Sequence, residues 1–343
     1  NSEKKKPIFL KDPYIHTMEN QLLKYLDIKI HHLIKEREFD RILIKGGYDR
    51  ELIISKNEKS DKLFNYHRPT AKIDRNCLTI FVSAGSDYIM HYASLIATYL
   101  ALNKRRYDHV FYLEPTIKER ERLIIESNLK NIKPNKIAIV GFGLTDMFGL
   151  DSWKGEGAFL YKHKKIGEND VTLLGCKHSL WGDIAEIFTK YLANNLGVKT
   201  LIYIGKLGSL KKWVKPNSYI ATGSTSFVKG KEIKWINLFD HIKSPHLIRG
   251  NHYSSPSTLL ENKRWLNRSE HFDFVDPEIG YFAKGAVESK INFSYLHIIS
   301  NNLREIHKEN LSNERSLKIT KKRKLLLNEI KRILSRTDLA KDI

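Results

Sequence analysis

The chain has 343 residues, 41% of them hydrophobic, and a formal net charge of +20 at pH 7. This length is sufficient for two domains, and this apolar fraction is typical of a folded globular protein. No stretch approaches the roughly 18 apolar residues of a membrane helix. No apolar run follows the lysines at positions 4–6, so we expect neither a membrane span nor a secretory signal.

The excess of basic residues predicts attraction to anions such as phosphate, nucleotides or nucleic acid. No recognised nucleic-acid-binding motif accompanies this charge, so we favour a small-molecule partner and keep nucleic acid as the alternative. Cys77 and Cys176 cannot form a disulfide framework and lack metal-ligand spacing. Both lie in apolar runs, which indicates buried free thiols, no metal site and a reducing, cytoplasmic compartment.

The first 133 residues are predicted to form a small α/β domain, because strands alternate with helices there. The expected elements are a helix over 17–38, a hairpin of 41–44 and 51–54, a loop over 55–74, a strand over 78–82, a helix over 91–102, a strand over 109–113 and a helix over 117–128. The break at 131–135 indicates a domain boundary after residue 133.

Residues 134–343 are predicted to form a second α/β domain. Gly197 follows an amphipathic helix as a C-cap residue, and residues 223–270 are expected to be less regular. The other expected elements are strands over 136–140, 157–163, 171–176, 199–204, 218–221, 271–275 and 295–299, and helices over 183–196, 277–290 and 319–334.

Five strands of this second domain are followed by glycine or polar residues. Open α/β sheets bind ligands at the carboxyl ends of their strands, so these strand ends are the candidate site. The five segments are Gly141-Phe142-Gly143, Lys177-His178, Gly205-Lys206-Leu207-Gly208, Asp276-Pro277-Glu278 and Ser300-Asn301-Asn302.

The order and spacing of these segments resemble the nucleoside phosphorylase superfamily, most closely its purine nucleoside and methylthioadenosine phosphorylase branches. The resemblance spans roughly residues 134–335. It implies a phosphorylase-type mixed central sheet flanked by helices, here preceded by a smaller α/β N-terminal domain, and a homo-oligomer. The similar segments are 136–146, 173–178, 196–210, 214–220, 275–283 and 298–302.

The resemblance also implies cleavage of the N-glycosidic bond of a purine-type nucleoside or nucleotide. This reaction develops positive charge on the sugar and negative charge on the leaving base, and both must be stabilised. Glu278 would hold the ribose hydroxyls, and Asn301 would hydrogen-bond to the base, with Asn302 taking that role if the register shifts by one residue. Each residue also has a structural alternative. Glu278 is then a carboxylate that the helix N-terminus favours, and Asn301 and Asn302 only cap the junction between a strand and a loop.

The remaining candidate residues would bind an anion or the ribose. Lys177 and His178 would bind phosphate. The structural alternative is that they are a surface lysine beside a half-buried histidine. Glycine backbone amides would line the pocket, and His252 would contact ribose or phosphate unless it is a solvated loop residue. The expected amide positions are Gly141, Gly143, Gly205, Lys206 and Gly208.

Three positions depart from the family pattern. Phe142 stands where phosphorylases have Ser or Thr, Lys206 replaces a small residue, and Pro277 replaces Met. Three interpretations therefore stay open. The chain either uses inorganic phosphate as co-substrate, or activates water through Asp146 or Glu156, or binds a nucleotide without turnover. No other cofactor is implied.

Overall fold

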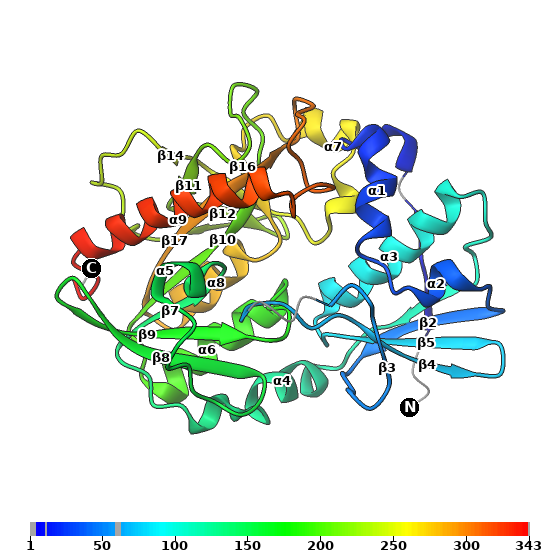
Figure 1. The fold of residues 1–343 in the computed structure, drawn as a ribbon, viewed down its shortest axis with the longest axis horizontal. Coiled ribbons are helices and arrows are strands. Elements are labelled where there is room, and N and C mark those ends of the chain that lie inside the picture. Colours follow the sequence, from blue (N-terminus) through cyan, green and yellow to red (C-terminus); the bar gives the residue numbers. More distant parts are fainter. Residues whose placement is uncertain (1–4, 11, 59–62, 342–343) are drawn as a thin grey trace.

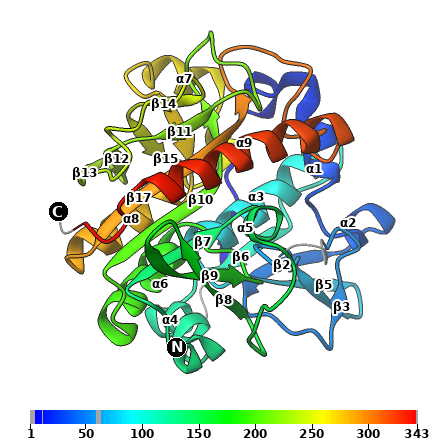
Figure 2. The same cartoon turned by 60° about the vertical axis from the view of Figure 1, so that its left-hand side comes forward.

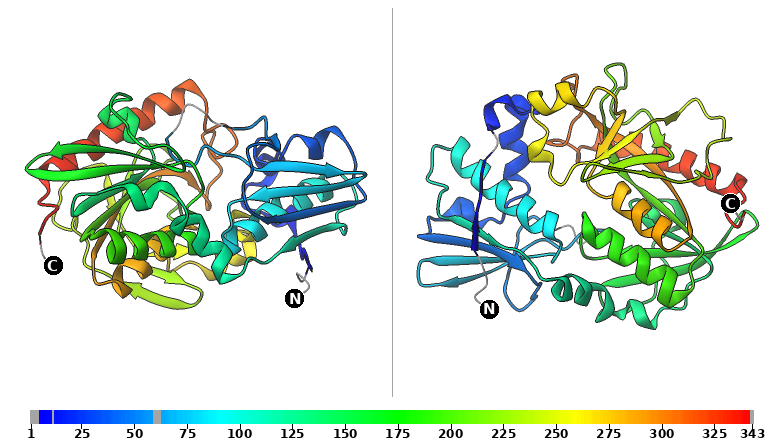
Figure 3. Two further views of the ribbon diagram at one scale, coloured as in Figure 1. Left: turned by 90° about the horizontal axis from the view of Figure 1, so that it is seen from below. Right: turned by 180° about the vertical axis from the view of Figure 1, so that it is seen from behind.

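The computed structural model describes residues 5–10, 12–58 and 63–341, and these residues form helices around two separate β-sheets (Figure 1). The strands of the smaller sheet lie within residues 5–113, and those of the larger within residues 137–302. This arrangement confirms the predicted fold class. The boundary at 133/134 falls between the two sets of strands and stays a prediction. The described ends of the chain lie on opposite sides of the molecule (Figure 3).

The smaller sheet has the strand order β1-β6-β2-β5-β4-β3. Its central strand β2 runs parallel to β5 and β6, and α3 packs on one face of these strands. The described elements are β1 (Lys5–Pro7), η1 (Pro13–Ile15), η2 (Glu19–Gln21), α1 (Leu22–Asp27), α2 (Leu33–Glu36), β2 (Arg41–Gly46), β3 (Ile53–Ile54), β4 (Thr70–Asp74), β5 (Cys77–Val82), α3 (Ser86–Leu102), β6 (Val110–Leu113), α4 (Ile117–Ile125) and η3 (Asn128–Asn131).

Four predictions for this half were wrong: a hairpin, a loop, a buried cysteine and one long helix. The residues expected to form a hairpin do not pair with each other: β2 joins β5 and β6, whereas β3 joins β4. The central position buries Ile42 and Ile44 almost completely, which a two-stranded hairpin cannot do. The loop expected over 55–74 ends in the strand β4. In addition, Cys77 is partly exposed, whereas Cys176 is buried as predicted.

The long helix predicted over 17–38 is broken between α1 and α2. The buried side chain of His31 lies at the break. Its Nδ1 accepts a 3.4 Å hydrogen bond from the backbone N–H of Leu33, and its Nε2 lies 3.1 Å from the carbonyl oxygen of Ile53. Such a local side-chain bond competes with the helical hydrogen-bond ladder, so the periodic apolar residues form two short helices.

The larger sheet has β10 at its centre, bonded to β7, β16 and β17. Strands and a helix also occupy 223–270, where the sequence predicted irregular structure. The described elements are β7 (Ile137–Gly141), α5 (Leu144–Phe148), β8 (Phe159–Ile166), β9 (Asn169–Cys176), α6 (Asp183–Leu196), β10 (Thr200–Ser209), β11 (Ile220–Thr222), β12 (Thr225–Val228), β13 (Lys231–Lys234), β14 (Leu247–Arg249), β15 (His252–Ser254), η4 (Thr258–Leu260), α7 (Lys263–Arg268), β16 (Phe274–Asp276), α8 (Ile279–Glu288), β17 (Asn292–Asn302) and α9 (Leu317–Arg336).

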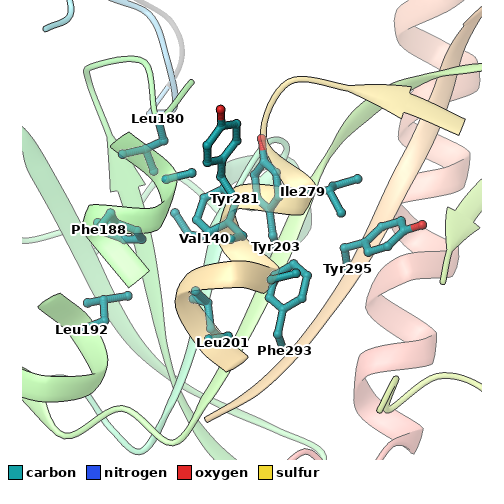
Figure 4. Close-up of a cluster of buried hydrophobic side chains, with 14 of the residues drawn as sticks. Val140, Leu180, Phe188, Leu192, Leu201, Tyr203, Ile279, Tyr281, Phe293 and Tyr295 are labelled. Carbon is teal, nitrogen blue, oxygen red and sulfur yellow. The ribbon is translucent and has the colours of Figure 1, made fainter. Parts of the chain in front are cut away.

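Helices cover both faces of the larger sheet. Successive side chains of a strand point to opposite faces, so Leu201 and Tyr203 of β10 pack against α6 and α8, as Figure 4 shows, whereas Ile202 and Ile204 face α9. Figure 2 shows α9 lying across the strands. Burial on both faces explains the nearly continuous apolar runs of β7 and β10. No helix in the described part of the chain combines the length and apolar character that crossing a membrane requires.

Candidate active site at the carboxyl ends of the central strands

The glycine loop after β7 lies directly against β10. Gly141 has φ +130°, and a Cβ atom there would stand 1.8 Å from the carbonyl oxygen of Ile204. That same oxygen accepts a 2.7 Å hydrogen bond from the backbone N–H of Phe142. Only glycine permits both the dihedral angle and the close approach. The loop that carries Phe142 and Gly143 is therefore held at the middle of β10.

A cavity of about 570 Å³ lies beside this loop. Its walls come from the glycine loop and the start of α5, from the first half of α9, and from Glu58, Leu63 and Phe64 of the N-terminal half. The carboxylate-bearing Asp146 of α5 also lines it. Pockets of this size accommodate small-molecule ligands, so the cavity is large enough for a base with its sugar.

Four charged side chains meet next to the cavity. The carboxylate of Glu314, which is 5% exposed, forms an ion pair with Lys206 of β10. Its Oε2 lies 3.4 Å from Nη1 of Arg323, and its Oε1 lies 3.6 Å from Nζ of Lys29. The ammonium group of Lys206 also lies 5.2 Å from the centre of the Phe142 ring. We refer to Lys29, Lys206 and Arg323 as the cationic cluster.

Glu278 lies between β16 and α8, near the middle of β10. Because β16 runs antiparallel to β10 with Val275 opposite Gly208, the chain after β16 returns along β10 toward Lys206. Burial raises the pKa of Glu278 well above its usual value, and the nearby charge of Asp276 raises it further, whereas Lys206 opposes the shift. Glu278 is thus favoured in its protonated form, because burial and Asp276 together outweigh Lys206.

Asn301 and Asn302 have different surroundings. Asn301 pairs with Gly208 in the sheet, and its Oδ1 accepts a 3.1 Å hydrogen bond from the Ser300 hydroxyl. The Nδ2 of Asn302 donates 2.8 Å hydrogen bonds to the carbonyls of Lys211 and Val214. The two asparagines also line a much smaller cavity of about 30 Å³. The hydrogen bonds of Asn302 serve the chain itself, so Asn301 is the better candidate for base contact.

Lys177 and His178 are attached to the N-terminal half. The backbone carbonyl of Lys177 accepts a 3.0 Å hydrogen bond from the N–H of His67. The rings of Tyr48, His67 and His178 pack together, with centroids 4.7 Å to 5.5 Å apart. Burial and neighbouring charges lower the pKa of His67 to about 3 and that of His178 to about 4. Neither Lys177 nor His178 is among the described residues that line the large cavity.

His252 is a core residue rather than a solvated loop residue. It is fully buried, and its Nδ1 lies 2.8 Å from the Ser226 hydroxyl. Its Nε2 lies 3.0 Å from Oδ1 of Asp276. The fully buried His297 fills the space beneath Gly205, where an added Cβ would stand 2.5 Å from its Nε2. His252 therefore underlies the strand ends and does not line the large cavity.

The structure thus brings Gly141, Gly143 and Asp146 to the cavity, places Lys206 beside it, and sets Gly208 between β16 and β17. Glu156 does not line the cavity in the described residues. Among those residues, no group of three or more His, Cys, Asp or Glu side chains could hold a metal ion.

Sequence reasoning missed Glu314 and Arg323. For Arg323 a signal was present: the buried stripe of α9 includes Ile319 and Leu326, and Arg323 falls on that stripe at helical spacing. A cation on an otherwise apolar helix face indicates a buried partner. Nothing comparable distinguishes Glu314, which lies in a polar segment without periodicity.

Comparisons with known proteins show likeness at the level of structure only. No protein-family model matches the sequence, and neither does any curated protein. The 5′-methylthioadenosine/S-adenosylhomocysteine nucleosidase of Campylobacter jejuni is 14% identical, with a TM-score of 0.46 over 58% of this chain and 98% of that one. The 5′-methylthioadenosine nucleosidase of Arabidopsis thaliana is also 14% identical, with a TM-score of 0.45 over 60% and 97%.

A futalosine hydrolase mutant of Helicobacter pylori is 14% identical as well, with a TM-score of 0.43 over 58% of this chain and 96% of that one. In each case nearly all of the known protein matches about three-fifths of this chain. Likeness this weak transfers no residue role and no substrate to this chain.

Proposed function

We propose that this chain binds a purine-type nucleoside or nucleotide at the carboxyl ends of β7, β10 and β17 and cleaves its N-glycosidic bond. The observation that carries the proposal is the position of Gly208, which pairs with Val275 on one side and Asn301 on the other. This register brings the segments that carry Glu278 and Asn301 to either side of the end of β10, although neither residue is among the described residues that line the large cavity.

The surroundings of Glu278 suit this reaction. Burial and Asp276 favour its neutral form in the empty protein. As the glycosidic bond breaks, positive charge develops on the sugar, and that charge would favour the ionised carboxylate. The interaction is then stronger in the transition state than with bound substrate, which is the difference that accelerates a reaction.

Asn301 would stabilise the leaving base by hydrogen bonding. An amide group has no proton to give up at neutral pH, so it cannot act as a general acid. The hydroxyl of Ser300 donates to Oδ1 of Asn301 and thereby orients the amide, which leaves Nδ2 as the donor toward a base. We therefore expect 6-oxopurine nucleosides, whose carbonyl oxygen accepts such a bond, to be better substrates than 6-aminopurine nucleosides.

We favour water as the nucleophile, with Asp146 as the base that activates it. Asp146 lines the cavity, whereas Glu156 does not, and Phe142 occupies the loop position at which a hydroxyl would contact phosphate. Replacing Asp146 with Asn should slow base release on the order of 100-fold or more. The exposed Asp170→Asn change in the same sheet is the matched control.

The test is to incubate the full chain with purine nucleosides and nucleotides, with and without inorganic phosphate, and to measure free base by chromatography. Base released without phosphate supports hydrolysis, and base released only with phosphate supports phosphorolysis. The Glu278→Gln variant should release little base, whereas the exposed Glu270→Gln control should behave like the parent chain. Absence of free base from every nucleoside and nucleotide would contradict the proposal.

A second candidate function is nucleotide binding without turnover. The ion pair between Glu314 and Lys206 favours it, because a carboxylate of the chain already neutralises a cation beside the cavity. Calorimetric binding of a nucleotide, combined with no release of base over a long incubation, would select this alternative.

A further inference from the structure

The side chain of Arg323 is buried but incompletely paired. Its Nε donates a 2.8 Å hydrogen bond to Oδ1 of Asn217, and its Nη1 lies 3.4 Å from the Glu314 carboxylate. Its Nη2 is buried and has no hydrogen-bond partner among the described residues. A buried donor without a partner costs about 1–3 kcal/mol, and more for a charged group. The guanidinium is 6% exposed, so bulk water does not compensate for the missing bond.

The residue that carries this unpaired donor lines the large cavity. Arg323 lines the cavity together with Arg315 and Lys324, whose side chains are exposed. The guanidinium is therefore buried at the boundary of a space of about 570 Å³, into which a ligand can bring an acceptor. Burial lowers the pKa of Arg323, and Glu314 raises it, so an anion at this position is what keeps the charge favourable.

Glu314 meets the cationic cluster in the way an anionic ligand would. Its carboxylate contacts Lys206 of β10, Arg323 of α9 and Lys29 of the N-terminal half. Glu314 belongs to residues 303–316, a segment without helix or strand that connects β17 to α9. The cations come from three separate parts of the fold, and this one carboxylate contacts all three.

We propose that the cationic cluster is a phosphate-binding site and that Glu314 occupies it in the ligand-free protein. A carboxylate offers two oxygen atoms and one charge, whereas a phosphate group offers three strong acceptor oxygens and up to two charges. Phosphate can therefore replace Glu314 and also accept from the Nη2 of Arg323. The phosphate is either inorganic phosphate or the phosphate ester of a nucleotide, and only the identity of the remaining ligand rests on the proposed function.

The test is calorimetric titration of the full chain with inorganic phosphate, inosine 5′-monophosphate and inosine at one fixed ionic strength. Glu314→Gln removes the internal competitor, so phosphate should bind about tenfold tighter or better. Arg323→Gln should weaken phosphate binding by at least about tenfold. The exposed Glu305→Gln and Lys321→Gln changes, in the same segment and helix, are matched controls and should leave the affinity within about twofold.

The ligands separate the two sources of phosphate. Binding of inorganic phosphate identifies it as the occupant. Binding of the nucleotide, but of neither inorganic phosphate nor inosine, identifies a phosphate ester. The site is refuted if neither phosphate compound binds the parent chain or Glu314→Gln. It is also refuted if Glu314→Gln leaves phosphate binding unchanged or weaker.

Removing Glu314 also leaves buried cations less well compensated, so the variant needs a folding check. We expect Glu314→Gln to melt below the parent chain and to regain stability as phosphate is added. Should it fail to fold, Glu314→Asp withdraws the carboxylate by one methylene and should show the same gain in phosphate affinity. The titrations require no turnover. Lost base release with intact phosphate binding would therefore refute only the proposed reaction, and the reverse result only the phosphate site.

Discussion

The imidazole Nε2 of His252 lies 3.0 Å from Oδ1 of Asp276, and the side chains of both residues are almost fully buried. Nε2 of His297 approaches the other carboxylate oxygen at 3.5 Å. Burial alone would raise the pKa of Asp276, but the two histidines outweigh it and hold the pKa below its usual value. The same Oδ1 accepts 2.9 Å hydrogen bonds from the backbone N–H groups of Glu278 and Ile279. Asp276 thus fixes the start of α8 and the backbone that carries Glu278.

His252→Ala should therefore act on stability. Asp276 is a buried carboxylate, and removing a partner of a buried charge costs about 3–5 kcal/mol, because that charge is left uncompensated. We expect a loss of that size in the free energy of unfolding, measured by urea denaturation at pH 7. The exposed His241→Ala is the control and should change little. If His252→Ala kept full stability and only weakened ligand binding, the earlier expectation of a substrate contact would be favoured.

Glu278→Gln should become more stabilising as pH rises. The folded-state pKa of Glu278 is raised above its ordinary value of 4.5. Its contribution to stability is therefore complete below that value and is lost as pH rises toward the folded-state pKa. The variant cannot ionise, so its stability relative to the parent chain should increase between pH 4.5 and pH 8 in urea titrations. A difference that does not vary with pH would show that Glu278 is ionised in the folded protein.

His91 should make the protein sensitive to acid. Burial lowers its pKa from 6.5 to about 3, and its Nδ1 lies 2.7 Å from the hydroxyl of Ser257. The folded-state pKa is depressed, so the stabilising contribution is present above pH 6.5 and is lost as pH falls toward 3. A shift of this size corresponds to about 5 kcal/mol.

His91→Asn should remove this part of the acid dependence in urea denaturation followed at several pH values. The exposed His246→Asn is the control. The ring of His91 stacks on Trp181 with centroids 4.4 Å apart, so this histidine lies at the contact between α3 and the C-terminal half. An unchanged pH profile in His91→Asn would assign the acid sensitivity to other groups.

Substitutions of Asn301 and Asn302 should affect different measurements, base release for Asn301 and stability for Asn302. Asn302→Ala removes the donor of two backbone carbonyls and should cost about 2 kcal/mol of stability, measured by thermal denaturation. Asn301→Ala should change stability little and reduce base release at least about tenfold, because its amide is the proposed hydrogen-bond donor to the base. The opposite pattern would move the base contact to Asn302.

Elements with strong local signals were predicted well from the sequence. The helix over 183–196 was predicted with the bounds of α6, because Gly197 adopts a left-handed φ of 75° that ends it. The apolar runs of β7, β10 and β17 also stood out, since burial on both faces leaves few polar residues in them. The same apolar runs also located the ends of these three strands as candidate site positions. The roles of the residues at those ends stay predictions, as do the homo-oligomer and the cytoplasmic location.

The remaining features depend on partners that are distant in the sequence. No local pattern near β2 indicates that it pairs with β5 and β6 instead of β3. The short strands within 223–270 are defined by their neighbours in the sheet, as when β15 joins β16. The sequence around His252 predicts a loop residue, because it does not show that Asp276 lies beside this histidine. Glu314 likewise has no sequence signal, because its three cationic contacts lie 9 to 285 residues away.

The short segment at 63–64 links the two halves of the chain more closely than its length suggests. Phe64 forms an isolated β-bridge with Cys176 at the end of β9, and Leu63 and Phe64 form part of the cavity wall. A molecule held in that cavity would touch both halves at once, so its binding energy would add to the cohesion between them. Residues 134–343 expressed alone would lack that wall, and transplanting the pocket into another scaffold would require this segment as well.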